Sequence, residues 1–187
     1  IFCQLRLQDQ ICLYSHSAFS NLALCEAWYT PAKYTDRIVY AGLVGSRPFE
    51  KDSLSPTDKS AAMPSVLPTI NGILLPMRRM NMTKIEYLLL MAIVFFDPEC
   101  LTLSENGRCI IAAKRKRLLK SLKAHLDHKL DAVDSSCRFG EILLRLTSIQ
   151  KVARYKRDTM KASPSSSPSL CTLTAEIASK YAENSFF

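Results

Sequence analysis

Histidine and cysteine are the residue types in this chain best suited to catalysis or metal binding, and their spacing predicts neither. None of the three histidines, His16, His125 and His128, has a cysteine, serine or carboxylate beside it in a catalytic or metal-binding pattern. His125 and His128 are one helical turn apart, which suits two metal ligands, but their lysine-rich surroundings favour a solvent-exposed pair. The sequence also contains no GxSxG, P-loop, HExxH or GxGxxG motif. We therefore expect no enzyme, no metal site and no cofactor.

The seven cysteines, at positions 3, 12, 25, 100, 109, 137 and 171, form no CxxC pair and no regular spacing. Zinc sites and disulfide frameworks have such regularity, so the sequence suggests neither and favours an intracellular, reducing compartment. The basic run KRKR at 114–117 suits a localisation signal, a nucleic-acid patch or a solvated helix face. No aromatic stacking residues and no second basic segment lie nearby, which favours the solvated face.

The composition describes one globular domain rather than a fibre, a disordered chain or a membrane protein. Of the 187 residues, 48% are hydrophobic and 22% are charged, and only 5 are glycine, which disfavours an all-β sandwich. The longest apolar run, residues 88–96, covers about half of the roughly 20 residues that a membrane helix needs. The net charge of +8 favours an acidic partner but is also ordinary for a solvated surface.

Helical periodicity divides the chain into elements. Apolar residues recur every three or four positions over residues 8–28, 66–82, 84–96 and 108–130, and again from a capping cluster at 134–136 to residue 156. Thr83 is the expected N-cap of the third of these helices, and Asp97-Pro98 ends it. Residues 37–44 predict one short β-hairpin, and the Ser/Pro-rich run at 163–169 predicts a break before a last weak helical segment.

Two blocks of the sequence resemble the ligand-binding domain of nuclear hormone receptors, in particular the hepatocyte nuclear factor four type and its nematode relatives. The first block is FCQLRLQDQI at 2–11, which is similar to the signature that joins the third family helix to the fourth. The second is MNMTKIEYLLLMAIVFFDP at 80–98, with Leu103-Ser104 and RFGEILL at 138–144, which resembles family helices eight to ten. Together the two blocks cover about half of the chain.

This resemblance implies an all-α, three-layer helical sandwich with one small β-hairpin. It implies a partial ligand-binding domain over residues 1–161, from the end of family helix three through helix ten. A Ser/Pro-rich linker over 162–170 and a divergent tail or degenerate activation helix over 171–187 would follow. The implied function is transcription regulation in the nucleus, without catalysis. One alternative stays open, a receptor relic or helical protein-interaction module that binds no ligand.

The resemblance also assigns candidate site residues. The ligand pocket would contain Phe19, Leu22 and Tyr29, with Leu22 fully buried. The coactivator groove would contain Gln10, Ile11, Tyr14 and Glu176. A dimer seam would run along Leu146, Ile149 and Ala153, a stripe whose heptad-like spacing also suits packing inside the chain. Glu86 and Arg138 would form a structural polar pair.

The resemblance further limits the expected partners. Tyr29 stands where fatty-acid-binding relatives carry an arginine, so a neutral lipophilic ligand or none is expected. Homodimers or receptor heterodimers would form through the seam. An LxxLL coactivator or a corepressor is a further candidate partner. An LxxLL helix would bind weakly or not at all, because family helix one, most of helix three and its clamping lysine have no counterpart in this sequence. Zinc would belong to an upstream DNA-binding domain, so we expect no direct DNA contact and no membrane contact by this chain.

Overall fold

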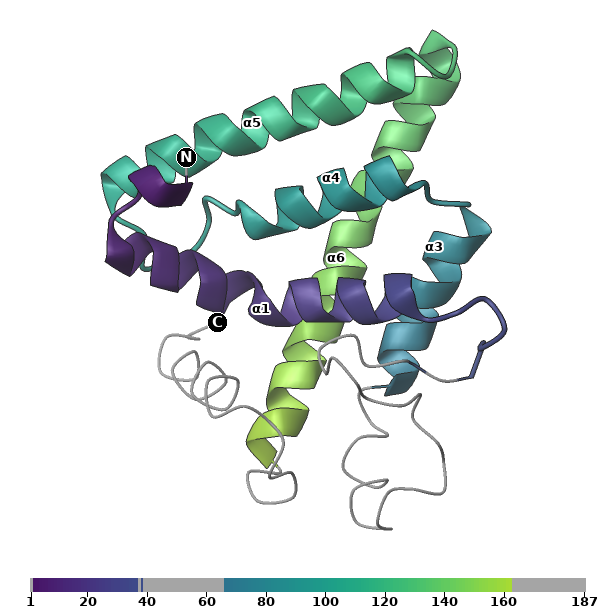
Figure 1. The fold of residues 1–187 in the computed structure, drawn as a ribbon, viewed down its shortest axis with the longest axis horizontal. Helices are drawn as coiled ribbons and strands as arrows, with labels where there is room; N and C mark the ends of the chain where they lie inside the picture. The colour runs from purple at the N-terminus through teal and green to yellow at the C-terminus, as the bar shows by residue number, and fades with distance from the viewer. Residues whose placement is uncertain (1, 37, 39–65, 163–187) are drawn as a thin grey trace. The chain divides into compact units, whose positions relative to one another are not determined.

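The computed structural model describes residues 2–36, 38 and 66–162, with side chains as far as residue 159 (Figure 1). The hairpin expected at 37–44, apart from Ile38, lies outside the described residues, as do the linker from 163 onward and Glu176. Contacts divide the chain into two compact units, Ile1–Asn21 with Met82–Thr147 and Leu22–Asn81 with Ser148–Phe187. We call these the first unit and the second unit.

The regular elements of the described residues are all helical, and the expected all-α class is confirmed. In chain order they are η1 (Phe2–Gln4), α1 (Leu7–Tyr29), η2 (Ile70–Leu74), α3 (Leu75–Arg79), α4 (Lys84–Phe95), α5 (Glu105–Asp127) and α6 (Ala132–Ala162). Residues 66–69 form a further helical turn that leads into η2. None of the helices described here is long and apolar enough to cross a lipid bilayer.

A cluster of buried apolar side chains forms the core of the first unit. It brings together the start of α1, the segment that follows α4 and the start of α5, through Leu5, Cys12, Leu13, Cys100, Leu103 and Ile111. Aromatic rings cover this cluster, and the ring centroids of Phe2 and Phe95 are 5.7 Å apart. Helices α4 and α5 contact each other and run side by side in opposite directions (Figure 1).

Helix starts in the first unit are set by polar caps, and only one of them was located correctly from the sequence. The expected capping box at Thr83 is present, with the Thr83 and Glu86 side chains each bonded to the other's backbone N–H. Helix α5 begins at Glu105, three residues before the predicted start, because Ser104 caps it. Helix α6 begins at Ala132, because the Asp131 carboxylate accepts hydrogen bonds from the backbone N–H groups of residues 133 and 134. The predicted capping cluster at 134–136 therefore lies inside the helix.

In the second unit, the helix predicted over 66–82 is interrupted by the π-helical turn η2. The backbone N–H of Leu75 donates to the carbonyl of Ile70, five residues earlier, and Pro76 follows with no N–H to continue the α-helical pattern. Gly72 faces α6 closely, since a Cβ there would lie 3.2 Å from Val152 Cγ2. Asn81, with a φ of 48°, makes the turn that ends this segment.

Candidate functional site

An exposed apolar face on the first half of α1 is the clearest surface feature of the first unit. The side chains of Leu7, Ile11 and Tyr14 are 71%, 48% and 50% exposed, and their spacing of four and three residues places them on one face. Gln10 is half-buried and its side-chain amide donates to the Leu5 carbonyl at 2.9 Å. Of the predicted coactivator groove, the structure therefore describes Gln10, Ile11 and Tyr14. Sequence reasoning missed Leu7, although its helical spacing from Ile11 was visible.

A buried carboxylate ties the start of this helix to the start of α5. Asp9 accepts hydrogen bonds from the Ser104 hydroxyl at 2.7 Å and from the Ser104 backbone N–H at 2.8 Å. The two bonds from Ser104 lower the pKa of the Asp9 carboxyl. A Cβ at Gly107 would lie 2.6 Å from Asp9 Oδ2, so only glycine fits beside this carboxylate. The bonds hold the exposed face of α1 in a fixed position within the unit.

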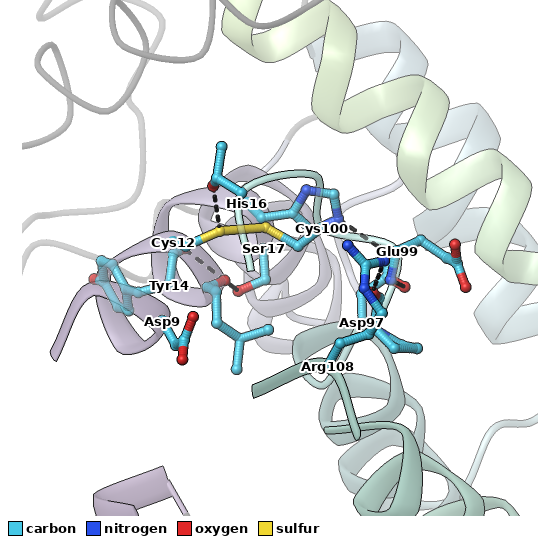
Figure 2. Close-up of a disulfide and its surroundings, with 12 residues drawn as sticks. Asp9, Cys12, Tyr14, His16, Ser17, Asp97, Glu99, Cys100 and Arg108 are labelled. Atoms are coloured by element: carbon cyan, nitrogen blue, oxygen red, sulfur yellow. Dashed lines mark hydrogen bonds and ion pairs between the residues drawn. A yellow bond between two sulfur atoms is a disulfide. The ribbon is translucent and has the colours of Figure 1, made fainter. Parts of the chain in front are cut away.

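Asp97 joins α1 to α5 at a second polar contact, which is shown in Figure 2. Its carboxylate accepts from Arg115 at 2.6 Å and lies 3.0 Å from His16 Nε2. Burial alone would raise the pKa of Asp97, but the hydrogen bonds from His16 and the Glu99 backbone and the Arg115 charge lower it. The basic run at 114–117 is thus divided, because Arg115 is paired and Lys114 lies 5.8 Å above the Phe96 ring. The other two cations of the run are exposed.

A disulfide, Cys12–Cys100, lies within the described part of the chain, where the sequence suggested no disulfide framework (Figure 2). The two Cα atoms are 7.3 Å apart and the residues are separated by 88 positions. No local spacing could reveal this pair, because packing of the first-unit core brings the two cysteines together. Of the other described cysteines, Cys3, Cys109 and Cys137 are free thiols. Among the described residues, no three histidine, cysteine or carboxylate side chains gather in a way that could hold a metal ion.

Glu86 and Arg138 form a buried ion pair in the first unit in which the carboxylate is fully bonded. Arg138 donates from Nε and from a terminal nitrogen to the two Glu86 oxygens, at 2.8 Å and 3.0 Å. The Thr83 backbone N–H donates to Glu86 Oε2 at 2.7 Å. Burial alone would raise the pKa of Glu86, but the hydrogen bonds from Arg138 and Thr83 lower it, and the same pairing raises the pKa of Arg138. The expected polar pair is thus in direct contact.

A second buried ion pair, Glu26–Lys156, lies in the second unit and was not predicted. Lys156 Nζ is 2.6 Å from Glu26 Oε2, and the two side chains are 6% and 0% exposed. Glu26 Oε1 has no hydrogen-bond partner among the residues that the structure describes. Burial raises the pKa of Glu26 despite the Lys156 charge. The only sequence signal was a charged residue on each of two apolar helix faces.

The three predicted ligand-pocket residues differ in burial. Phe19 is buried, in the first unit. Leu22 is only half-buried, so the expectation of complete burial is wrong. The adjacent Ala23 and Leu24 are the fully buried residues of this part of α1. Tyr29 is 62% exposed at the end of α1, so its phenol lies at the surface instead of in an interior pocket.

The predicted dimer seam on α6 is wrong for two of its three residues. Ile149 and Ala153 are buried within the chain and Leu146 is half-buried, so this apolar stripe packs inside the protein. Burial against the chain's own core is the alternative that heptad-like spacing left open. Val133, Cys137 and Leu144, at spacings of four and seven, form an exposed stripe on α6 in the first unit. Gly140 lies between them, and a Cβ there would meet nothing within 4 Å.

Comparison with known proteins gives one consistent result. A family model described as the ligand-binding domain of nuclear hormone receptor matches residues 1–164. Nuclear hormone receptor family member nhr-47 of Caenorhabditis elegans is 30% identical over 119 residues, 64% of this chain and 21% of the relative. Hepatocyte nuclear factor 4-beta of Xenopus laevis is 29% identical over 151 residues, 81% of this chain and 31% of the relative. The chain thus spans about a fifth to a third of these two relatives.

Proposed function

Because the chain belongs to the nuclear hormone receptor ligand-binding domain family, we propose that it regulates transcription by binding protein partners as one domain of a receptor. The family match over residues 1–164 favours this function over the alternative, a receptor relic or helical protein-interaction module that binds no ligand. Domains of this family typically bind lipophilic ligands, commonly dimerise and bind coactivators, and they are generally nuclear and non-enzymatic. A nuclear location without catalysis is therefore part of the proposal.

The exposed apolar face of α1 is the observation that carries the proposal. Leu7, Ile11 and Tyr14 present about two helical turns of apolar surface to solvent, which is costly unless a partner covers it. An LxxLL helix presents leucines at matching i, i+3 and i+4 spacing, so it can lie along this face. Asp9 and Ser104 fix the end of α1 where the face begins, which lowers the ordering cost of binding.

Titration of the purified 187-residue chain with an LxxLL peptide, followed by isothermal calorimetry, tests this interface. We expect a Kd of about 100 µM, roughly −5.5 kcal/mol, because this chain lacks the clamping lysine expected from the family resemblance. Ile11→Asp should abolish binding, since it places a charge on the apolar face. Leu101→Asp is the control, because Leu101 is an apolar residue of the first unit that is 74% exposed, against 48% for Ile11, and lies outside α1. Equal binding by the wild type and Ile11→Asp would reject the α1 face as the interface.

For dimerisation, we propose that the outward face of α6 replaces the seam predicted from the sequence. Val133, Cys137 and Leu144 are exposed, and the open space beside Gly140 lets another helix approach its backbone. Sedimentation should show a dimer that Leu144→Glu dissociates and that Leu101→Glu leaves intact. A dimer that survives Leu144→Glu would reject this face, and a monomeric wild type would reject dimerisation by this chain.

A further inference from the structure

The Cys12–Cys100 disulfide crosslinks two segments of the first unit that are far apart in the sequence. Cys12 lies in the first half of α1, and Cys100 lies in the segment between α4 and α5. The bond joins residues 88 positions apart, and both belong to the buried apolar cluster. Because a crosslink that closes so long a loop restricts the unfolded chain, the first unit should be more stable with the bond than without it.

The nuclear location in the proposed function implies that this bond is not permanent. Glutathione and thioredoxin keep thiols reduced in the nucleus, and the disulfides that form in such a compartment are usually transient and redox-sensing. The irregular cysteine spacing likewise favours a reducing compartment. The bond is therefore expected to form and break as the supply of oxidant changes.

Noncovalent contacts join the same two segments whether or not the disulfide is present. On one side of Cys100, the Asp97 carboxylate lies 3.0 Å from His16 Nε2 on α1. On the other side, the hydroxyl and backbone N–H of Ser104 donate to Asp9, near the start of α1. These contacts keep the first unit folded when the bond is broken, so the bond can alternate between two states of one fold.

The disulfide acts beside the exposed apolar face of α1. Cys12 directly follows Ile11, which lies on that face with Leu7 and Tyr14. Figure 2 shows Tyr14 and the disulfide on the same stretch of α1. With the bond intact, this half of the helix is covalently tied to the segment before α5, and with the bond broken only the noncovalent contacts hold it. The redox state of the pair therefore sets how easily the helix opens beneath its exposed face.

We propose that Cys12 and Cys100 are a site of reversible oxidation, and that its disulfide stiffens the first half of α1 when the surroundings become oxidising. In the forward step the two thiols give two electrons and two protons to one oxidised glutathione, which becomes two reduced glutathiones as the bond between the cysteine sulfurs forms. The reverse step consumes two reduced glutathiones and releases the oxidised form. The Thr102 hydroxyl lies 2.7 Å from Cys12 Sγ and can donate to a Cys12 thiolate during exchange.

The first experiment tests whether the bond is reversible. The 187-residue chain is incubated with an excess of reduced or of oxidised glutathione, quenched with acid, unfolded, alkylated and mapped by peptide mass spectrometry. We expect Cys12 and Cys100 to be alkylated after reduced glutathione, and the peptide joined through them to return when the same sample is moved to oxidised glutathione. A bond that survives reduced glutathione, or that does not return, would overturn the proposal.

The second experiment tests the effect on α1. Hydrogen exchange of residues 7–14 should be about tenfold slower in the oxidised form than in the reduced form. Cys12→Ala/Cys100→Ala should exchange at one rate in both glutathione buffers, whereas Cys109→Ala, which removes an exposed thiol of the same unit, should keep the difference. If the double variant does not fold, the two forms of the wild type decide alone.

Equal exchange rates in the two forms of the wild type would overturn the proposal. The inference rests on the proposed function only for the reducing location. Neither experiment uses an LxxLL peptide, so failure of the redox site and failure of the α1 interface are distinguishable.

Discussion

The two units each contain a buried ion pair, and the two pairs differ in how completely they are hydrogen-bonded. In the first unit, the Arg138 guanidinium holds both oxygens of Glu86, and the Thr83 backbone adds a third bond. In the second unit, the Lys156 ammonium lies near one oxygen of Glu26 and the other oxygen has no partner in the described part of the chain. A guanidinium matches a carboxylate with a planar fork, whereas an ammonium is a point charge. The first pair is complete by itself, and the second has capacity for another polar group.

The largest effect should come from breaking the complete pair. Arg138→Ala leaves the buried Glu86 carboxylate without its cation, so we expect the free energy of unfolding to fall by about 3–5 kcal/mol. Urea denaturation followed by circular dichroism measures it. Arg138→Lys keeps the charge but loses the two-pronged guanidinium contact. Its free energy of unfolding should lie between those of the wild type and the alanine variant. A loss below about 1 kcal/mol for Arg138→Ala would show that Glu86 does not depend on this partner.

The incomplete pair should respond in the opposite direction when both of its charges are replaced. Glu26→Leu/Lys156→Met exchanges two desolvated charges for apolar side chains, and we expect unchanged stability or a gain of about 1–4 kcal/mol. The same replacement at Glu86 and Arg138 would also remove the hydrogen bond from the Thr83 backbone N–H to Glu86, which is half of the capping box of α4, so it is expected to destabilise the chain. Urea denaturation of the two double variants compares them directly. A large loss from the Glu26–Lys156 replacement would mean that this pair is structural.

Three glycines test packing, Gly107 and Gly140 in the first unit and Gly72 in the second. Gly107→Ala places a Cβ 2.6 Å from the Asp9 carboxylate, which is held by Ser104, and we expect a loss of about 1–3 kcal/mol. Gly72→Ala meets only a methyl group of Val152 at 3.2 Å, which can shift, so a smaller loss is expected. Gly140→Ala meets nothing within 4 Å and should stabilise α6 by about 0.5–1 kcal/mol. Thermal denaturation of the three variants should give this order.

The smallest effect should be the pH dependence, which has opposite signs for the two carboxyl groups. Hydrogen bonding lowers the pKa of Glu86, so its contribution to stability is present above pH 4.5 and is lost as the pH falls through its folded pKa. Burial raises the pKa of Glu26, so its contribution is full below pH 4.5 and is lost as the pH rises through its folded pKa. Each pKa unit corresponds to about 1.4 kcal/mol.

Unfolding of the wild type, Glu86→Gln and Glu26→Gln between pH 8 and pH 3 measures both contributions. As the pH falls, the difference in the free energy of unfolding between the wild type and Glu86→Gln should shrink. The difference between the wild type and Glu26→Gln should grow. If the free energy of unfolding of the two variants changed with pH in the same way, the two carboxyl groups would not differ in the sign of their contribution.

Local chemistry explains which parts of the fold were predictable from sequence. The Thr83 capping box and the Asp97-Pro98 stop are signals contained within a few residues, so α4 was located to within one residue at its end. The cap of α6 was missed because the three polar residues at 134–136 are as suitable for an N-cap by residue type as Asp131. Only the backbone N–H groups that donate to Asp131 identify it as the cap. The π-helical turn before Pro76 was missed because periodicity does not distinguish it from an α-helical turn.

The sequence by itself determined that the chain is helical and that Glu86 and Arg138 are partners, since apolar periodicity shows the first and the family resemblance shows the second. Only the tertiary structure decided that Ile149 and Ala153 are buried, that Cys12 meets Cys100, and that Glu26 meets Lys156. A helical pattern shows that a face is apolar but not what covers it, and residues 88 or 130 positions apart carry no sign of their contact. Such contacts depend on how separate helices pack, which no local spacing encodes.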